Sequence, residues 1–468
     1  MLRALSLLMA IACFSAILML AACGSPAALQ PVPERTAGYL FRNVAVLDPV
    51  ADAVTPPQDV LVIDGVIAEA GRIDPARIPR GVTEIDGRGQ VLMPGLMDMH
   101  VHVFDEADLA ANLVHGVTTV RNLSGFPAHL SLAADIEAGT LLGPRLVTSG
   151  PIVNERGGRH VNVLHVEATG AAEARAEVHR QYRRGFRHIK VYTDLSAETL
   201  SGVVETAREL GMSVSGHPAE GNPAEPVDFA VTLDAGFATI EHTESIVWHG
   251  LQDDTDLDRA RQLARAIAAA GATVTPTLVV HENLTLIGET GGAHIRRADM
   301  EGYNPVAAGF ETDTFAYWSS YTEGGRRRMQ TFYEIFTGEM HRAGVRLVVG
   351  TDAGVMATPH GVSVLREMEL LVEAGLTPAE ALRAATVNPA DVLGLGDALG
   401  RVAPGYRADL VLVSADPRAD FQVLRDPSGV MRDGVWLDRE RLEALREASH
   451  RPSRVKTWRR LVMHLLRR

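Results

Sequence analysis

The side chains best suited to metal or acid–base chemistry are a few histidines, one lysine and one aspartate. His100 and His102 are separated by a single residue. Side chains of an extended segment alternate between two faces, so this pair points the same way. Imidazole nitrogens are common zinc ligands, and the spacing therefore indicates a metal site. Two hydrogen-bonded histidines in a protein core would produce the same pattern.

Lys190 is unusual in both its surroundings and its rarity. It lies in the apolar segment His188–Tyr192, and Lys456 is the only other lysine among the 468 residues. An unpaired ammonium group is costly to bury. Lys190 is therefore either one half of a buried ion pair with a carboxylate or a residue with a chemical role.

Three further candidates each end a short apolar stretch, and these are His217, His242 and Asp352. Taken singly, each could be a buried polar residue whose hydrogen bonds are satisfied. Together with the first three they form an ordered set of six at the ends of successive apolar segments, which unrelated core residues do not readily give. The set predicts one metal-binding site assembled from distant parts of the chain.

The elements that must position these side chains alternate between short apolar segments and amphipathic ones. The expected strands are the segment ending at His100, Val117–Asn122, Arg145–Gly150, His188–Asp194, Ser213–His217, Thr239–His242, Ala272–Leu278 and Arg346–Asp352. The expected helices include Ala197–Leu210, Asp256–Ala270, Gly361–Ala374 and one capped by Thr377. Eight strands, each followed by a helix, predict an α/β fold. This is a (β/α)8 TIM barrel over residues 93–398, with its chemistry at the C-terminal strand ends.

The two flanks of this region have a different sequence pattern, which predicts short strands joined by turns. Val60–Ile63 and Val66–Ala70 enclose Asp64-Gly65, a hairpin signal. We expect residues 37–92 and 399–438 to form one small β-sandwich domain built from both ends of the chain.

Residues 439–468 are expected to be a helical tail with an apolar stripe among basic side chains. The stripe consists of Val455, Trp458, Val462 and Leu465. A basic amphipathic helix suits an anionic membrane surface, and packing against the barrel is the alternative.

Composition excludes several classes of function. The formal net charge is −13 and no broad basic stripe is present, which argues against nucleic-acid binding. The only cysteines, Cys13 and Cys23, lie at the N-terminal end. A chain cut at Cys23 would therefore hold no free thiol for catalysis and no cysteine zinc site.

Residues 1–22 combine a basic start with an apolar run that ends in small residues, as in an export signal. Leu20–Cys23 resembles the lipobox of bacterial lipoproteins, which implies a lipid anchor on Cys23. Residues 23–36 would then be a tether, and Gly24 after the cysteine implies the outer membrane, facing the periplasm. A plain signal peptide and an uncleaved membrane anchor are the alternatives.

The order His-x-His, Lys, His, His, Asp resembles the amidohydrolase superfamily with a binuclear metal centre, and within it the imidazolonepropionase-related and prolidase-like branch. Supporting stretches are Met93–Asp98, Ile240–Thr243, Gly350–Gly354, Ala385–Ala390 and Gly405–Leu410. The resemblance implies a TIM barrel with an appended β-sandwich, which agrees with the layout expected from the apolar segments.

By position, the resemblance implies that His100, His102 and Asp352 bind one metal ion and that His217 and His242 bind a second. Lys190 would bridge both ions as N6-carboxylysine. Two divalent ions are expected, with zinc as the first candidate, and Asp352 would accept a proton from the water between them. The mononuclear imidazolonepropionase type lacks this lysine, so Lys190 favours the prolidase-like dipeptidases.

The expected reaction is hydrolysis of an amide or peptide bond in a small substrate, a dipeptide or an N-acyl amino acid. Tyr192 faces the same side as Lys190, and in the prolidase-like relatives a tyrosine at this position contacts the substrate. His160 or Arg159 could hold the substrate carboxylate. The alternatives are a cyclic-amide or lactone hydrolase and, from another class, a catalytically inactive binding lipoprotein. A homo-oligomer is compatible with the sequence.

Residues 279–340 are long for a connection between a strand and a helix, and they predict either a lid over the pocket or a packed helical insertion. Four histidines are left without a role and are expected to be surface imidazoles: His165, His249, His281 and His294.

Overall fold

The computed structural model describes residues 32–466 apart from 34–35, 163 and 322–323. The predicted export signal and the predicted lipidation site Cys23 lie outside the described residues, as does most of the predicted tether.

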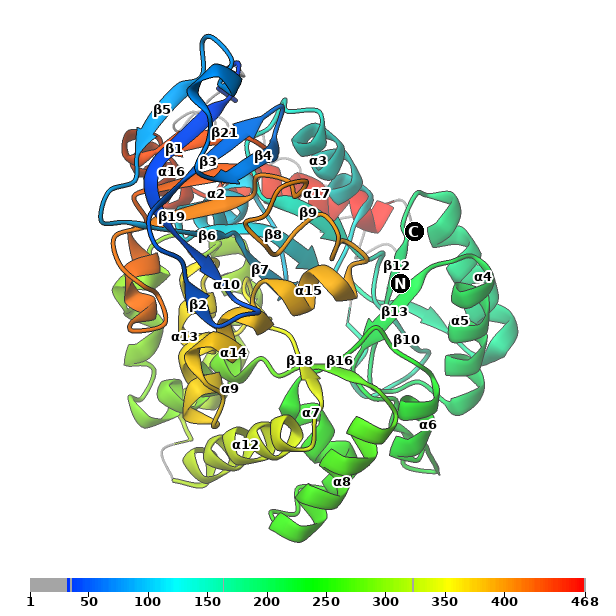
Figure 1. Ribbon diagram of the computed structural model, residues 1–468. Helices are drawn as coiled ribbons and strands as arrows, with labels where there is room; N and C mark the ends of the chain where they lie inside the picture. Colours follow the sequence, from blue (N-terminus) through cyan, green and yellow to red (C-terminus); the bar gives the residue numbers. More distant parts are fainter. Residues whose placement is uncertain (1–31, 34–35, 163, 322–323, 467–468) are drawn as a thin grey trace.

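Two parallel sheets form the centre of the molecule (Figure 1). The larger has the strand order β11 (Val166–Ala168), β10 (Val153–Glu155), β12 (His188–Val191), β13 (Ser213–Gly216), β16 (Thr239–Glu241), β17 (Thr273–Thr275) and β18 (Arg346–Leu347). The smaller contains β7 (Leu96–Val101), β8 (Val117–Asn122) and β9 (Arg145–Thr148). All eight predicted strands are present, and β10 and β11 are additional.

The ladders of the two sheets are separate, and isolated parallel bridges link them at both ends. Ser149 after β9 pairs with His188 of β12, and Val101 of β7 pairs with Ala353. The parallel pairing brings the carboxyl ends of the strands to a common side, where loop residues can meet.

Two of the expected strands are shorter than the apolar pattern predicts. β17 ends at Thr275 because Pro276 has no N–H to donate and Thr277 adopts a φ of 51°. β18 ends at Leu347 because the backbone groups of the next residues form hydrogen bonds with different strands. Val348 donates to Val274, whereas Val349 accepts from Met99.

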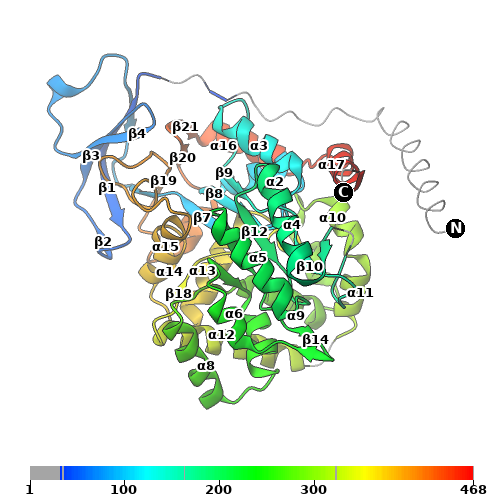
Figure 2. The same cartoon turned by 90° about the vertical axis from the view of Figure 1, so that its right-hand side faces the viewer.

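Helices cover the outside of the parallel sheets (Figures 1 and 2). They are α2 (Glu106–Val114), α3 (Pro127–Glu137), α4 (Gly170–Arg183), α5 (Ala197–Glu209), α6 (Phe229–Asp234), α7 (Thr243–Ile246), α8 (Leu257–Ala269), α12 (Gly325–Arg342), α13 (Val362–Glu373), α14 (Pro378–Ala384) and α15 (Val387–Val392). Thr377 caps α14 in a reciprocal capping box with Glu380, as its sequence predicts.

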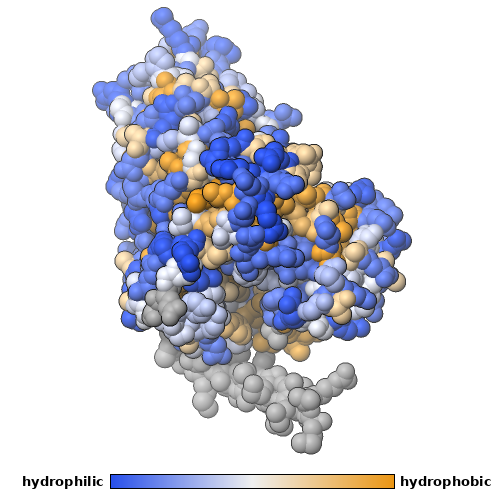
Figure 3. All heavy atoms as spheres, turned by 90° about the horizontal axis from the view of Figure 1, so that it is seen from below, coloured by the Kyte–Doolittle hydropathy of each residue, from blue (hydrophilic) through white to orange (hydrophobic). Residues whose placement is uncertain are grey.

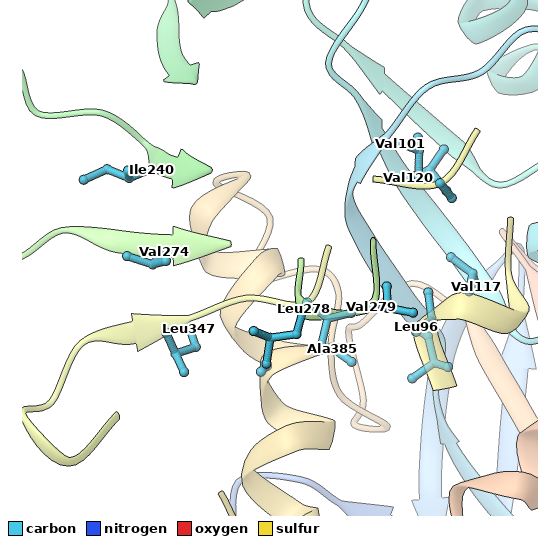
Figure 4. Packing of buried hydrophobic residues seen from close by; sticks show 14 of the residues in the cluster. Leu96, Val101, Val117, Val120, Ile240, Val274, Leu278, Val279, Leu347 and Ala385 are labelled. Carbon is cyan, nitrogen blue, oxygen red and sulfur yellow. The ribbon is translucent and has the colours of Figure 1, made fainter. Parts of the chain in front are cut away.

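The main hydrophobic core lies between these helices and the strands. Figure 4 shows part of it, with Ile240, Val274 and Leu347 on the successive strands β16, β17 and β18. The face of the molecule in Figure 3 is mostly hydrophilic, and hydrophobic residues reach it only in patches. Within the described residues, no helix combines the length and the apolar character needed to cross a bilayer.

A nine-stranded sheet at one end of the molecule joins both flanks of the chain (Figure 2). Its strands are β1 (Tyr39–Asp48), β2 (Ala53–Val54), β3 (Gln58–Ile63), β4 (Val66–Gly71), β5 (Thr83–Asp86), β6 (Val91–Pro94), β19 (Leu410–Val413), β20 (Gly429–Arg432) and β21 (Val435–Asp438). β3 and β4 form the predicted hairpin, and Asp64 and Gly65 both have the positive φ of a type I′ turn.

The long segment 279–340 is helical. It runs through α9 (Leu278–Glu289), α10 (Pro305–Phe310) and α11 (Thr312–Ser319) into α12. At the other end of the chain, α16 (Arg439–Ser449) packs on α2, and α17 (Arg454–Leu466) contacts α10.

Candidate active site and metal centre

Three candidate ligands meet where β7 ends. His100 is buried on this strand, and His102 follows it directly. Oδ1 of Asp352 lies 3.2 Å from Nε2 of His100 and 2.8 Å from Nε2 of His102. Asp352 has a φ of 60°, a strained conformation for a residue other than glycine. The fold therefore holds this carboxylate against both imidazoles.

His242 and His217 extend the group. The ring centroid of His242 lies 4.7 Å from that of His100 and 4.5 Å from that of His217. One ligand atom from each of His100, His242 and Asp352 falls within 4.8 Å of the others. Burial lowers the pKa of His217 and His242 well below the usual range, so both rings are neutral and keep a lone pair for a metal ion.

Lys190 projects from β12 into the same site and is almost completely buried. Its Nζ has no hydrogen-bond partner among the described residues, and no ion pair to a described carboxylate is formed. Burial lowers the pKa of Lys190 to about 8, whereas the charges of Glu241 and Asp352 oppose that shift. An orphaned amine with a lowered pKa fits a lysine that is modified when the site is complete.

A second set of polar residues surrounds the candidate ligands and orients them. Glu241 lies 2.8 Å from Nδ1 of His100, and Arg121 donates to Glu241 at 2.9 Å. Nδ1 of His242 lies 2.8 Å from the hydroxyl of Thr277. With Nδ1 engaged in both rings, Nε2 is the nitrogen left to face a metal ion.

Sequence reasoning missed the part played by Glu241 and Arg121. Glu241 directly precedes His242, and Arg121 lies inside the apolar strand β8, so each is a charged residue in a segment predicted to be buried. That signal could have suggested a buried ion pair. It could not have suggested that the pair forms across strands, because the contact depends on β8 of one sheet and β16 of the other lying close together.

All six predicted ligands line one cavity of about 340 Å³. This volume suits a small ligand. Five of the rings that line it follow one another in a row, in the order His165, Tyr192, His217, His242 and His281. Centroids are separated by 4.8 Å from His165 to Tyr192, by 4.1 Å from Tyr192 to His217, and by 6.4 Å from His242 to His281. The row places Tyr192 and His281 on opposite sides of the candidate ligands.

The wall on the Tyr192 side is polar. Burial raises the pKa of Tyr192 above its usual range, so its hydroxyl stays protonated and can donate a hydrogen bond. His160 also lines this wall, and its Nδ1 lies 3.0 Å from Asp194. Arg159 is exposed and lies 3.8 Å from Glu220, so its side chain is directed to a different partner.

The opposite wall comes from α7, from the helical segment Val247–Leu251 that follows it, and from α9 and α11, and it is mainly aromatic and apolar. It contains Trp248, Val280, His281, Leu284 and Trp318, together with the carboxylate of Glu244. Glu244 lies 3.0 Å from Nδ1 of His281 and 3.9 Å from Arg326. The long segment 279–340 therefore supplies a wall of the cavity.

The prediction that the unassigned histidines lie at the surface is wrong for His165 and His281, which are both buried. The sequence places them in a loop and at the start of a long insertion, where exposure is the usual expectation. His281 is instead buried on the helix α9, and His165 is buried beside the ring of Tyr192. His249 and His294 are partly buried, and His294 lies 2.9 Å from Asn283.

Comparison with known proteins shows similarity over most of the chain. The model of the amidohydrolase family matches residues 91–437. The chain is 24% identical to ochratoxinase from Aspergillus niger over 447 residues, covering 81% of each sequence. It is 26% identical to imidazolonepropionase from Ralstonia nicotianae, covering 80% of this chain and 91% of the relative. The structure of bottromycin amidohydrolase is similar with a TM-score of 0.74 and 28% identity, covering 92% of this chain and 94% of the other.

Proposed function

This chain belongs to the amidohydrolase family and is a hydrolase that acts on carbon–nitrogen bonds, and on that premise we propose that it uses two divalent metal ions to cleave a dipeptide or an N-acyl amino acid. The observation that carries the proposal is Lys190. It is buried beside the histidines and Asp352, and its Nζ has no partner among the described residues.

The residues present fit a pair of metal ions. His100, His102 and Asp352 would hold one ion, and His217 and His242 would hold the other. The neutral amine of Lys190 can add to the carbon of carbon dioxide and release a proton, which gives a carbamate that would supply anionic oxygen ligands to the metal site. When bound, two divalent ions polarise a carbonyl group and lower the pKa of water.

The side chains of the site would then handle the proton and the carbonyl group. Asp352 would take a proton from the attacking water and pass it to the nitrogen that leaves as the carbon–nitrogen bond breaks. Tyr192 would donate its hydroxyl proton in a hydrogen bond to the carbonyl oxygen, where negative charge develops. Glu241 would act by holding the ring of His100 in place, without touching the substrate.

The two walls suggest how a substrate would lie. His160, at the polar end, would receive the carboxylate of the leaving amino acid in a charge-assisted hydrogen bond. The acyl part would lie against Trp248 and Trp318. For this arrangement we also propose that the two parallel sheets, without the additional strands β10 and β11, are the two parts of one eight-stranded barrel that carries an appended β-sandwich.

The proposal predicts the metal content and the substrate class together. The full chain, purified in detergent and supplied with zinc, should retain about two zinc ions per chain. It should hydrolyse dipeptides or N-acyl amino acids faster than lactones. Elemental analysis and a coupled amine-release assay measure these outcomes. Turnover of lactones or cyclic amides without any turnover of the linear substrates would contradict the peptidase assignment.

Glu244 offers a way to tell a dipeptidase from an N-acyl amino acid hydrolase. Its carboxylate faces the end of the cavity that would hold the acyl part, so it could receive the free amino group of a dipeptide. For a dipeptidase, Glu244→Gln should lower kcat/KM for a dipeptide by about ten- to a hundredfold, the usual range for a hydrogen bond to a charged group. It should have little effect on the N-acetylated analogue.

Glu220→Gln is the matched control for this prediction, because Glu220 lies near the polar end and pairs with Arg159. If Glu244→Gln lowers kcat/KM equally for the dipeptide and its N-acetylated analogue, Glu244 does not bind the amino group.

A further inference from the structure

The C-terminal helix α17 (Arg454–Leu466) presents two different faces. One face packs on the body of the protein through Thr457, Leu461 and His464. The ring of His464 lies 4.5 Å from that of Phe126, and Asn304 donates to the hydroxyl of Thr457 at 3.0 Å. The side of α17 that packs on the protein is therefore the mixed stripe of Thr457, Leu461 and His464. It is not the apolar stripe predicted from the sequence.

The other face leaves its large apolar side chains in solvent. Val455, Trp458, Met463, Leu465 and Leu466 are 39–74% exposed. Val455, Trp458 and Leu465 belong to the apolar stripe that the sequence shows. Phe310 at the end of α10 is also exposed, and its ring lies 5.5 Å from that of Trp458. Figure 2 shows α17 at the edge of the molecule next to α10. Grouped apolar side chains on a surface mark an interaction site more often than scattered ones do.

The charge around this face is opposite to that of the whole chain. From Ala448 to Arg468 the sequence has seven Lys or Arg residues and no Asp or Glu, whereas the chain carries −13. Lys456 and Arg460 are engaged by Glu106. Arg454 and Arg459 are exposed, and neither forms an ion pair with a described residue. Their charges are free for an anionic partner.

We propose that the exposed face of α17, together with Phe310, docks on an anionic lipid surface with the helix lying in the plane of the membrane. A tryptophan, aliphatic side chains and unpaired arginines on one helix are the combination that binds at the boundary between headgroups and acyl chains. The helix has 13 residues, which is fewer than the roughly 20 needed to span the hydrocarbon core. A bilayer interface can take up exposed apolar side chains from one helix without needing a matching groove.

Fluorescence of Trp458 on vesicles tests this docking in the full chain. The signal assigned to Trp458 is the difference between the wild type and Trp458→Phe. On vesicles of phosphatidylcholine and phosphatidylglycerol that contain brominated lipid, this signal should be quenched. Quenching should fall with added salt and on pure phosphatidylcholine, because the arginines act through screened charge. The double variant Arg454→Gln and Arg459→Gln should lose most of it.

Leu465→Glu should also abolish the quenching, whereas Leu257→Glu should not. Leu257 is equally exposed but lies on α8, at the opposite end of the molecule in Figure 2. Hydrolase activity should be unchanged in these variants. Attachment of the chain to anionic vesicles with Trp458 unquenched would overturn the proposal, because another part of the chain would then make the contact. A concentration-dependent dimer that shields Trp458 without lipid would also overturn it, in favour of a second copy as the partner.

Discussion

Replacing Lys190 with alanine is expected to abolish hydrolysis. The proposed bridge would be lost, and the two ions would be bound by neutral imidazoles and one carboxylate alone. Loss of metal-based stabilisation of the transition state costs several kcal/mol, so kcat/KM should fall by about a thousandfold or more. The zinc content of the variant should fall below that of the wild type. Steady-state kinetics and elemental analysis on the same preparation measure both effects.

The chain supplies its own control for this experiment. Lys456 is the only other lysine, lies on α17 and contacts Glu106 at the surface, so Lys456→Ala should keep full activity. Short carboxylic acids should partly restore the Lys190→Ala enzyme, because their oxygens can occupy the place of the carbamate. Rescue would also show that the variant is folded. A fully active Lys190→Ala enzyme would remove the bridging role.

The parts of this fold that follow from local sequence rules agree with the structure. The β3–β4 hairpin and the Thr377 cap depend only on neighbouring residues, and both are present. The ends of β17 and β18 were less predictable. An apolar run shows burial, but the strand ends where backbone groups find partners outside the ladder, as at Val348 and Val349. That choice depends on the neighbouring strands.

In the candidate site, too, some features follow from the local sequence and others depend on distant parts of the chain. The order of its six predicted ligands could be predicted because each lies in or just after a short apolar segment, and all six line one cavity in the structure. The residues that form the walls of the cavity could not be predicted in this way. Glu244 and His281 come from helices that fold back over the strand ends, and nothing in their local sequence distinguishes them from surface residues. Arg121 and Glu241 form an ion pair between strands that are far apart in sequence.

Removing the hydroxyl of Tyr192 is expected to have the second-largest effect on catalysis. The side chain lies in the row of rings beside His217, and its raised pKa keeps the proton on the oxygen. If this hydroxyl stabilises the developing negative charge, Tyr192→Phe should cost about 2–4 kcal/mol of transition-state stabilisation, mostly in kcat. Zinc content should not change, because Tyr192 is not one of the proposed ligands.

Comparing a dipeptide with its C-terminal amide separates this role from recognition of the carboxylate. If His160 holds the carboxylate, the amide should be a much poorer substrate for the wild type, and His160→Ala should narrow that difference. Tyr192→Phe should slow both substrates alike if the hydroxyl acts on the scissile carbonyl, which the two share. A loss confined to the dipeptide would instead place the Tyr192 hydroxyl on the carboxylate. If the wild type hydrolyses the amide as fast as the dipeptide, and Tyr192→Phe hydrolyses both as fast as the wild type, the polar wall does not bind the leaving group. The substrate must then lie across the metal site in another direction.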